Sequence, residues 1–388
     1  MKFSERTAWP KAANRLALLA ETLRKTNRPF IDLTQSNPTN CLFKTLESRF
    51  LKPLADPANL FYKPDPRGHR DARLAVCRYY ADKKINIHPD RVVLTSSTSE
   101  AYTFLFRLLL DPKDKIAFPA PSYPLLDLLS QLNDAEGLRY RLLYEKKWQS
   151  DPGGLDEALK KGSKAICVVN PNNPTGNFIT EEEKKELSRQ CASNGCAIIS
   201  DEVFFDYRIE EGPAEPVSFA GNEEALTFVL SGISKILGLP QMKVSWIVVS
   251  GPESLAAEAL RRLEIVADTY LSVNTPAQTA LGSWLEKYPA INQEISKRVT
   301  DNYFFLKQTQ AGSAGLQVLN SEGGWVAILR SDLGMDDEKL ALTLLEKADV
   351  LVHPGYFYDF EKGDYLVLSL LPPPEHFKEA IKRIKGAV

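Results

Sequence analysis

The stretch Ala197-Ile-Ile-Ser200-Asp201 is a short apolar run that ends in a carboxylate, and it sets the expectation for the fold. Its first three side chains are apolar throughout rather than at every second position, which is typical of a strand covered on both faces. From about residue 90, five similar runs alternate with helical patterns: Val92–Thr95, Ile116–Phe118, Ala165–Val169, Thr227–Leu230 and Trp246–Val249. The sequence therefore predicts an α/β fold with a doubly wound, mostly parallel sheet.

Polar side chains follow several of these runs. They are Ser96–Thr98, Asn173, Asp201 and Lys235. In a doubly wound sheet, ligands bind beyond the carboxyl ends of the strands. We therefore expect these four loops to meet at one site.

Three of these side chains suit the chemistry of pyridoxal 5'-phosphate. Lys235 offers an amine for the aldehyde, and burial can bring such an amine into play near neutral pH. Asp201 could keep the ring nitrogen protonated, and the Asn173 amide could meet the phenolic oxygen. Taken singly, each also fits an ordinary role: a solvated lysine, an N-cap or ion-paired carboxylate, and an asparagine in a turn.

Two further segments offer contacts for a flat, phosphorylated ligand. Ser97 and Thr98 precede a helical run, where free backbone N–H groups can bind an anion, although Ser97 with Glu100 also fits a capping box. Tyr123 stands between prolines after a strand and is suited to stacking on a ring, or simply to packing.

Composition narrows the class of protein. The chain has 388 residues, 44% of them hydrophobic and 25% charged, with a formal net charge of -2. This charge gives no reason to expect nucleic acid or a membrane surface as a partner. No apolar run approaches the ~18 residues of a membrane helix and no apolar signal core is visible, so we expect the cytoplasm. Five cysteines without a Cys-x-x-Cys pair predict neither a disulfide framework nor a zinc site.

The chain is expected to form a large domain and a small one. Leu16, Leu19, Ala20 and Leu23 have the spacing of an amphipathic helix, which predicts an N-terminal arm. A long helix from about 277 to 310, a strand at Gly323–Trp325 and a final helix from about 375 predict a smaller α+β domain. We therefore divide the chain into 1–40 (arm and part of the small domain), 41–275 (large cofactor domain) and 276–388 (connecting helix and small domain).

Taken in order, these segments resemble the fold-type-I pyridoxal-phosphate enzymes, and among them the class I/II aminotransferases. The resemblance covers nearly the whole chain, including Tyr62-Lys-Pro-Asp-Pro-Arg-Gly68 and Val352-His-Pro-Gly355. It implies that Lys235 carries the internal aldimine, Asp201 pairs with the ring nitrogen and Asn173 meets the phenolic oxygen. It also implies that Tyr123 stacks on the ring and that Ser97 and Thr98 hold the phosphate. Tyr62 would reach the neighbouring subunit's cofactor, which implies a homodimer.

The chain departs from the family pattern around the cofactor. Relatives often have a serine three residues before the lysine and an arginine eight after it, where this chain has Gly232 and Lys243. Lys243 can pair with phosphate as a point charge, and Ser231 or Ser234 could replace the hydroxyl. Phe204 stands where a tyrosine hydroxyl is expected to bond the phenolic oxygen, and Tyr207 would compensate only if its loop brings it back.

A further departure concerns the substrate. Many relatives clamp the substrate carboxylate with an arginine in a C-terminal strand, where this chain has Val367. Arg28, Arg330, Lys63 and Lys362 are the candidates to supply a charge from elsewhere.

The resemblance implies an aminotransferase that moves an amino group between an amino donor and an oxo acid. A β-lyase on the same scaffold is the first alternative, because the same carbanion can eliminate a β-substituent. A catalytically silent binding or regulatory protein is the second.

Overall fold

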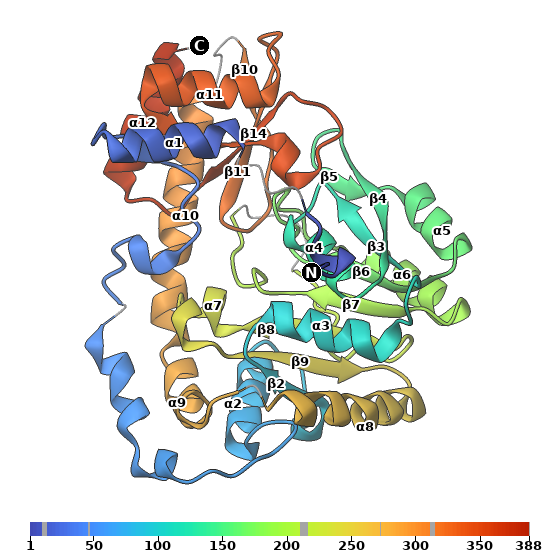
Figure 1. The fold of residues 1–388 in the computed structure, drawn as a ribbon. Helices are drawn as coiled ribbons and strands as arrows, with labels where there is room; N and C mark the ends of the chain where they lie inside the picture. The colour runs from blue at the N-terminus through green and yellow to red at the C-terminus, as the bar shows by residue number, and fades with distance from the viewer. Residues whose placement is uncertain (10–13, 46, 210–215, 272, 311–314, 388) are drawn as a thin grey trace.

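The computed structural model describes residues 1–9, 14–45, 47–209, 216–271, 273–310 and 315–387. A large sheet with helices on both faces forms one part of the molecule, and a smaller sheet with helices packed against it forms the other (Figure 1). The helix α10 (Tyr288–Gln310) runs alongside both parts.

The large sheet has eight strands in the order β2-β9-β8-β7-β6-β3-β4-β5. Their bounds are β2 Val92–Thr95, β3 Lys115–Ala120, β4 Glu136–Tyr144, β5 Trp148–Ser150, β6 Ser163–Val169, β7 Ala197–Asp201, β8 Thr227–Gly232 and β9 Ser245–Ser250. The strands β8, β7, β6, β3 and β4 are parallel, whereas β9 is antiparallel to both of its neighbours and β5 is antiparallel to β4. The predicted doubly wound, mostly parallel sheet is confirmed, and all six apolar runs lie in it.

Burial on both faces explains why these strands are apolar throughout. Successive side chains of a strand point to opposite faces. In β9, Trp246 and Val248 belong to one hydrophobic core, while Ile247 and Val249 belong to the other. The strand β4 near the edge of the sheet alternates between exposed and buried residues, so it offers no continuous apolar run and escapes prediction.

Helices cover both faces of this sheet. The core on one face includes side chains of α3, α4 and α8, and the core on the other includes side chains of α2, α5, α6 and α9 (Figure 1). Their bounds are α2 Arg70–Ala81, α3 Thr98–Leu109, α4 Leu125–Leu132, α5 Pro152–Lys160, α6 Glu181–Ser193, α7 Ile233–Ile236, α8 Glu253–Tyr270 and α9 Thr275–Leu285. None of the described helices combines the length and the apolar character needed to cross a bilayer.

The smaller part is built around the antiparallel sheet β10-β11-β14-β13. Its elements are β10 Leu316–Val318, β11 Val326–Ser331, β12 Val350–Leu351, β13 His353–Pro354, β14 Tyr365–Ser369, α11 Asp337–Ala348 and α12 Pro374–Ala387. The N-terminal arm joins it, because α1 (Arg15–Lys25) packs on α11 and β1 (Ile31–Asp32) pairs with β12. The division of the chain at residues 40 and 275 stays a prediction.

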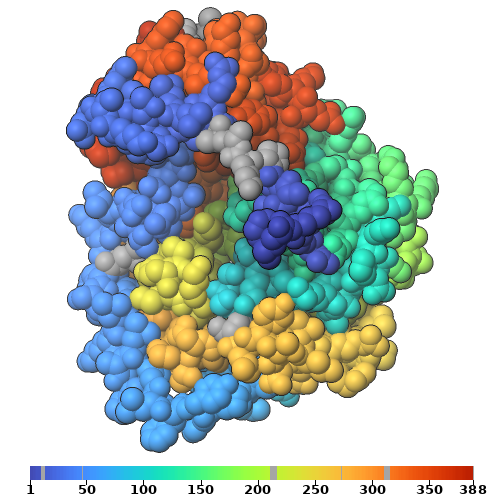
Figure 2. Space-filling model, viewed as in Figure 1, coloured from blue at the N-terminus to red at the C-terminus, as the bar shows by residue number. Residues whose placement is uncertain are grey.

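The first residues of the chain lie on the large part instead. The Trp9 indole N–H donates to the Gln131 amide oxygen (2.6 Å), and the Arg6 guanidinium donates to the Asp134 carboxylate (2.8 Å). Figure 2 shows this segment, in dark blue, as a lobe against the teal surface of the large part.

Two predicted elements differ from the structure. The long helix expected over 277–310 is two helices, because α9 ends at Leu285 and α10 begins at Tyr288, directly before Pro289. Proline lacks the N–H that a helix interior needs for its hydrogen bonds, so it is favoured in the first turn of a helix, where Pro289 lies. The strand expected at Gly323–Trp325 begins only at Val326. A Cβ at Gly323 would lie 2.6 Å from the Phe178 ring, so this glycine serves a close approach.

Candidate active site

A cavity of about 280 Å³ opens at the carboxyl ends of the parallel strands. The large part lines it with Thr98, Asn173, Asp201 and Lys235, and the smaller part lines it with residues of β11, β13 and β14. The volume lies close to the lower end for small-molecule sites, roughly 300 Å³. The four loops that the sequence assigns to one site therefore do meet there.

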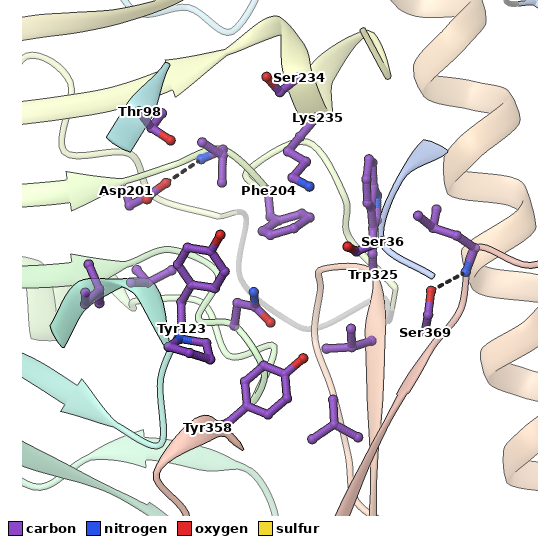
Figure 3. A pocket seen from close by; sticks show the side chains of 18 of the residues that line it. Ser36, Thr98, Tyr123, Asp201, Phe204, Ser234, Lys235, Trp325, Tyr358 and Ser369 are labelled. Carbon is purple, nitrogen blue, oxygen red and sulfur yellow. Dashed lines mark hydrogen bonds between the residues drawn. The ribbon is translucent and has the colours of Figure 1, made fainter. Parts of the chain in front are cut away.

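Lys235 enters the cavity from α7, the short helix that follows β8. Its Nζ atom lies 5.4 Å from the centre of the Phe204 ring and 5.1 Å from the Trp325 ring (Figure 3). Burial lowers the pKa of this amine from 10.5 to about 8, and the negative charge of Asp201 opposes the shift. The amine is thus a much better nucleophile near neutral pH than an exposed lysine.

Asp201 ends β7 and is only 8% exposed. Its carboxylate accepts hydrogen bonds from the Tyr102 hydroxyl (3.1 Å) and from the backbone N–H of Val203 (3.1 Å). Burial nevertheless raises the pKa of this carboxyl from 3.8 to about 6, against the effect of these bonds and of Lys235. A cation placed beside it would recover the free energy that burial of the charge costs.

The loop after β6 carries Asn173 into the cavity. The neighbouring Asn172 side chain donates to the Pro121 carbonyl (3.1 Å) and to the Thr175 hydroxyl (2.7 Å), which fixes the turn. Gly176 has φ +73°, and a Cβ there would lie 1.9 Å from the Ser321 hydroxyl oxygen. The tight turn therefore needs glycine both for its backbone conformation and for its space.

Thr98 and Tyr123 complete the part of the cavity on the large sheet. Thr98 begins α3, and Ser97 caps that helix by accepting from the Glu100 N–H (3.1 Å). The Glu100 carboxylate accepts from Ser96 N–H (2.7 Å) rather than from Ser97, so the capping box is incomplete. Tyr123 is 41% exposed and lines the opening beside Tyr358 (Figure 3).

The comparison with known proteins decides the family. The sequence model of the family described as "Aminotransferase class I and II" matches residues 28–384. The chain belongs to the class I and II aminotransferases. It is therefore an enzyme, a transferase of amino groups, as the resemblance implies.

Individual relatives agree with this membership. A glutamate-pyruvate aminotransferase of Haemophilus influenzae is 26% identical over 82% of this chain and 81% of its own. The solved structure of an alanine aminotransferase from Pyrococcus furiosus superposes with a TM-score of 0.90 at 25% identity, covering 99% of both chains. An S-alkyl-thiohydroximate lyase of Arabidopsis thaliana is 30% identical over 56% of this chain and 47% of its own. The predicted fold type I is confirmed.

Within this aminotransferase, Phe204 and Ser234 also line the cavity, as the sequence predicts. Four other candidate residues do not line it. Ser97 turns its hydroxyl to the helix cap, and the Ser231 hydroxyl donates to the Glu202 carbonyl at 3.5 Å. Lys243 is exposed in a left-handed conformation with φ 54°. Tyr62 is 71% exposed and lines a separate pocket, so in a single chain it cannot reach this cavity.

Tyr207 does not replace the hydroxyl absent at Phe204. It is buried against Trp325, and its hydroxyl donates to the Lys235 carbonyl (2.6 Å). The loop therefore does not return it to the cavity; it supports the backbone of the lysine instead.

None of the four candidates for the substrate carboxylate reaches the cavity either. Arg28 bonds to Asp349 and Arg330 to Gln317, while Lys63 lines the separate pocket and Lys362 is exposed. Val367 does line the cavity, as expected, and among the described residues no arginine does.

Sequence reasoning misses several lining residues: Tyr102, Ser245, Trp325, His353 and Tyr358. Tyr102 lies inside an apolar helical run, and Ser245 begins an apolar strand, so each reads as part of the core. His353 has the clearest signal, because it is next to Pro354-Gly355 in a segment already linked to the family. The register confirms its position, since His353 pairs with Val367 across β13 and β14.

Proposed function

We propose that this aminotransferase holds pyridoxal 5'-phosphate in the cavity and moves an amino group between an amino donor and an oxo acid, with Lys235 as its working amine. One observation carries the proposal. A half-buried lysine and a buried aspartate line the same cavity, and burial has moved both pKa values towards neutrality. Such pairs are typical of active sites.

The residues fit this cofactor. Asp201 is a buried carboxylate with neutral hydrogen-bond donors only, and a protonated ring nitrogen would supply the missing cation. When bound, pyridoxal phosphate supplies an aldehyde that condenses with amines and a ring that accepts electrons from the substrate. Asn173 would bond the phenolic oxygen, Tyr123 would stack on the ring, and Thr98 and Ser234 would hold the phosphate.

Lys235 would move the proton of the reaction. With its pKa near 8, the amine is partly neutral at physiological pH and can accept a proton from the substrate α-carbon. Phe204 and Trp325 keep its surroundings apolar, and the Tyr207 bond to its carbonyl fixes its backbone. These contacts support a single amine that takes and returns the proton.

We propose that the substrates are a small, uncharged amino acid and its oxo acid. The smaller part lines the cavity with the apolar side chains of Val326, Val367 and Leu371, which would meet an apolar substrate side chain. The imidazole of His353, which pairs with Val367 across β13 and β14, also lines the cavity and would donate to a carboxylate, and burial lowers its pKa. Alanine and pyruvate, after which these relatives are named, are the first pair to test.

The test of this function is dependence on an acceptor. The purified protein is incubated with a panel of amino acids, with and without pyruvate or 2-oxoglutarate, and the oxo product is measured. We expect turnover only when the oxo acid is present. Turnover without an acceptor would instead indicate the β-lyase, which the partial match to an S-alkyl-thiohydroximate lyase favours as the second candidate.

We also propose that two copies of the chain form a homodimer and that Tyr62 bonds the cofactor phosphate of the partner subunit. Leu60 and Phe61 beside it are 86% and 67% exposed, which supports an apolar surface covered by another copy. Replacing Tyr62 by phenylalanine should weaken cofactor binding about ten-fold, the usual effect of a bond to a charged group. Titration of the cofactor-free protein measures this, with Tyr356→Phe as the control. Wild-type protein that sediments as a monomer would contradict the proposal.

Phe204→Tyr tests the position of the phenolic oxygen. We expect the added hydroxyl to donate to this oxygen and to stabilise its ionised form, so the pKa of the bound cofactor falls. Absorbance of the loaded protein titrated with pH measures this, and the protonated band should fade at lower pH. Phe205→Tyr is the matched control, because Phe205 packs on Phe178 outside the cavity. An unchanged titration would contradict this placement of the ring.

We further propose a cytoplasmic location and keep the division of the chain at residues 40 and 275. The five cysteines are free thiols, four of them buried, which supports a reducing compartment.

A further inference from the structure

Gly232 and Ser245 lie opposite each other at the edge of the cavity. They are direct partners in the ladder between β8 and β9, and both line the cavity. A Cβ built on Gly232 would lie 2.2 Å from the Ser245 hydroxyl oxygen and 2.8 Å from its Cβ. The backbone at Gly232 is extended (φ 174°), which any residue can adopt. Glycine is therefore needed here to leave room for the Ser245 side chain.

The Ser245 hydroxyl has no hydrogen-bond partner among the residues that the structure describes. The residue is 1% exposed and lines the cavity. Its oxygen is not among the side-chain atoms that are both sealed from solvent and unpartnered, so it is open to the cavity. Because this hydroxyl belongs to a cavity-lining side chain, a ligand atom is its natural partner.

The neighbouring groups indicate the chemistry of that atom. Thr98, in the first turn of the twelve-residue helix α3, and Ser234, in the first turn of α7, line the same cavity. Hydroxyl donors and the free N–H groups of a long helix together favour a phosphate. The charged alternative, Lys243, is exposed, and Ser231 is turned towards Glu202.

We propose that Ser245 binds the phosphate of the cofactor and that Gly232 is glycine so that it can. Relatives often have a serine at the position of Gly232. In this chain the hydroxyl is supplied by Ser245 on the adjacent strand, and the residue opposite it is glycine, which leaves room for the serine side chain. This inference rests on the proposed function, since it assumes a phosphorylated cofactor in the cavity.

The experiment compares Ser245→Ala, Gly232→Ser and the double variant Gly232→Ser/Ser245→Gly. Cofactor-free protein is titrated with pyridoxal phosphate and separately with pyridoxal, which lacks the phosphate, and binding is followed by absorbance. We expect Ser245→Ala to weaken binding of pyridoxal phosphate about ten-fold, as loss of a bond to a charged group does, with less than about two-fold change for pyridoxal. Gly232→Ser alone should weaken binding further, because the two side chains collide.

The double variant is the decisive arm. It moves the hydroxyl back to position 232 and should restore the affinity for pyridoxal phosphate to within about three-fold of wild type. Ser250→Ala, a buried serine at the other end of β9, is the control and should bind as wild type. Equal losses for both ligands in Ser245→Ala, or none, would overturn the inference. Failure of the wild-type protein to bind pyridoxal phosphate would instead overturn the proposed function.

Discussion

Replacing Lys235 by alanine is expected to lower the rate of amino-group transfer by about a thousand-fold or more. Proton transfer by a positioned group alone contributes roughly 10²- to 10⁴-fold, and loss of the covalent attachment adds to this. Among the described residues, Lys235 is the only lysine that lines the cavity. No neighbouring amine can take its place, so the loss should not be recovered at high pH.

Two measurements check this expectation. Initial rates with the best donor and acceptor give the loss of activity. Borohydride treatment followed by peptide mass analysis locates the cofactor, which should be found on Lys235 in the wild-type protein and nowhere in the variant. Lys164→Ala is the matched control, because Lys164 is an exposed residue on β6. Cofactor trapped on another lysine, or a variant that retains a tenth of its activity, would refute the assignment.

The sequence could predict the site because of how the sheet is buried. Strands covered on both faces are apolar throughout, so the residue at which each strand ends can be located in the sequence. The polar residues that follow these strands then indicate one edge of the sheet. Asn173, Asp201 and Lys235 each stand at such an end. The two crossovers that join the adjacent parallel strands β6, β7 and β8 bring them together without any need to know the register.

What the sequence could not predict depends on strand register and on the direction in which single side chains point. Ser245 becomes meaningful only when β9 is aligned with β8, which places it opposite Gly232. Its role is concealed by its place in an apolar strand. Tyr102 is concealed in the same way inside α3, although its hydroxyl reaches Asp201. Lys243 is exposed and does not line the cavity, because spacing along the chain does not fix which way a turn points its side chain.

Replacing Asp201 by asparagine should have opposite effects on activity and on stability. Activity should fall by about a hundred-fold or more, because a neutral amide cannot hold a proton on the ring nitrogen. The amide keeps an oxygen that can accept from Tyr102 and Val203, so the geometry should survive. The cofactor-free protein, in contrast, should become more stable above pH 6.

The sign follows from the direction of the pKa shift. The pKa of Asp201 is about 6 in the folded protein and 3.8 when unperturbed, so the folded state binds the proton more tightly. Its contribution to stability is present below pH 3.8 and is lost as the pH rises to about 6. At pH 8 the carboxyl is ionised in both states, and burying its charge costs on the order of 3 kcal/mol of stability for a pKa difference of about two. An asparagine carries no charge and escapes this cost.

Urea unfolding of the cofactor-free proteins at pH 4 and pH 8 tests the prediction. The variant should be about 1–3 kcal/mol more stable than wild type at pH 8 and nearly equal to it at pH 4. Asp111→Asn, at an exposed position, should show no such difference. Equal stability at pH 8 would mean that the carboxylate is already paired without a cofactor. In that case Asp201 would be a structural residue. Only a carboxylate that has no cationic partner in the cofactor-free protein is stabilised when a protonated ring nitrogen binds beside it.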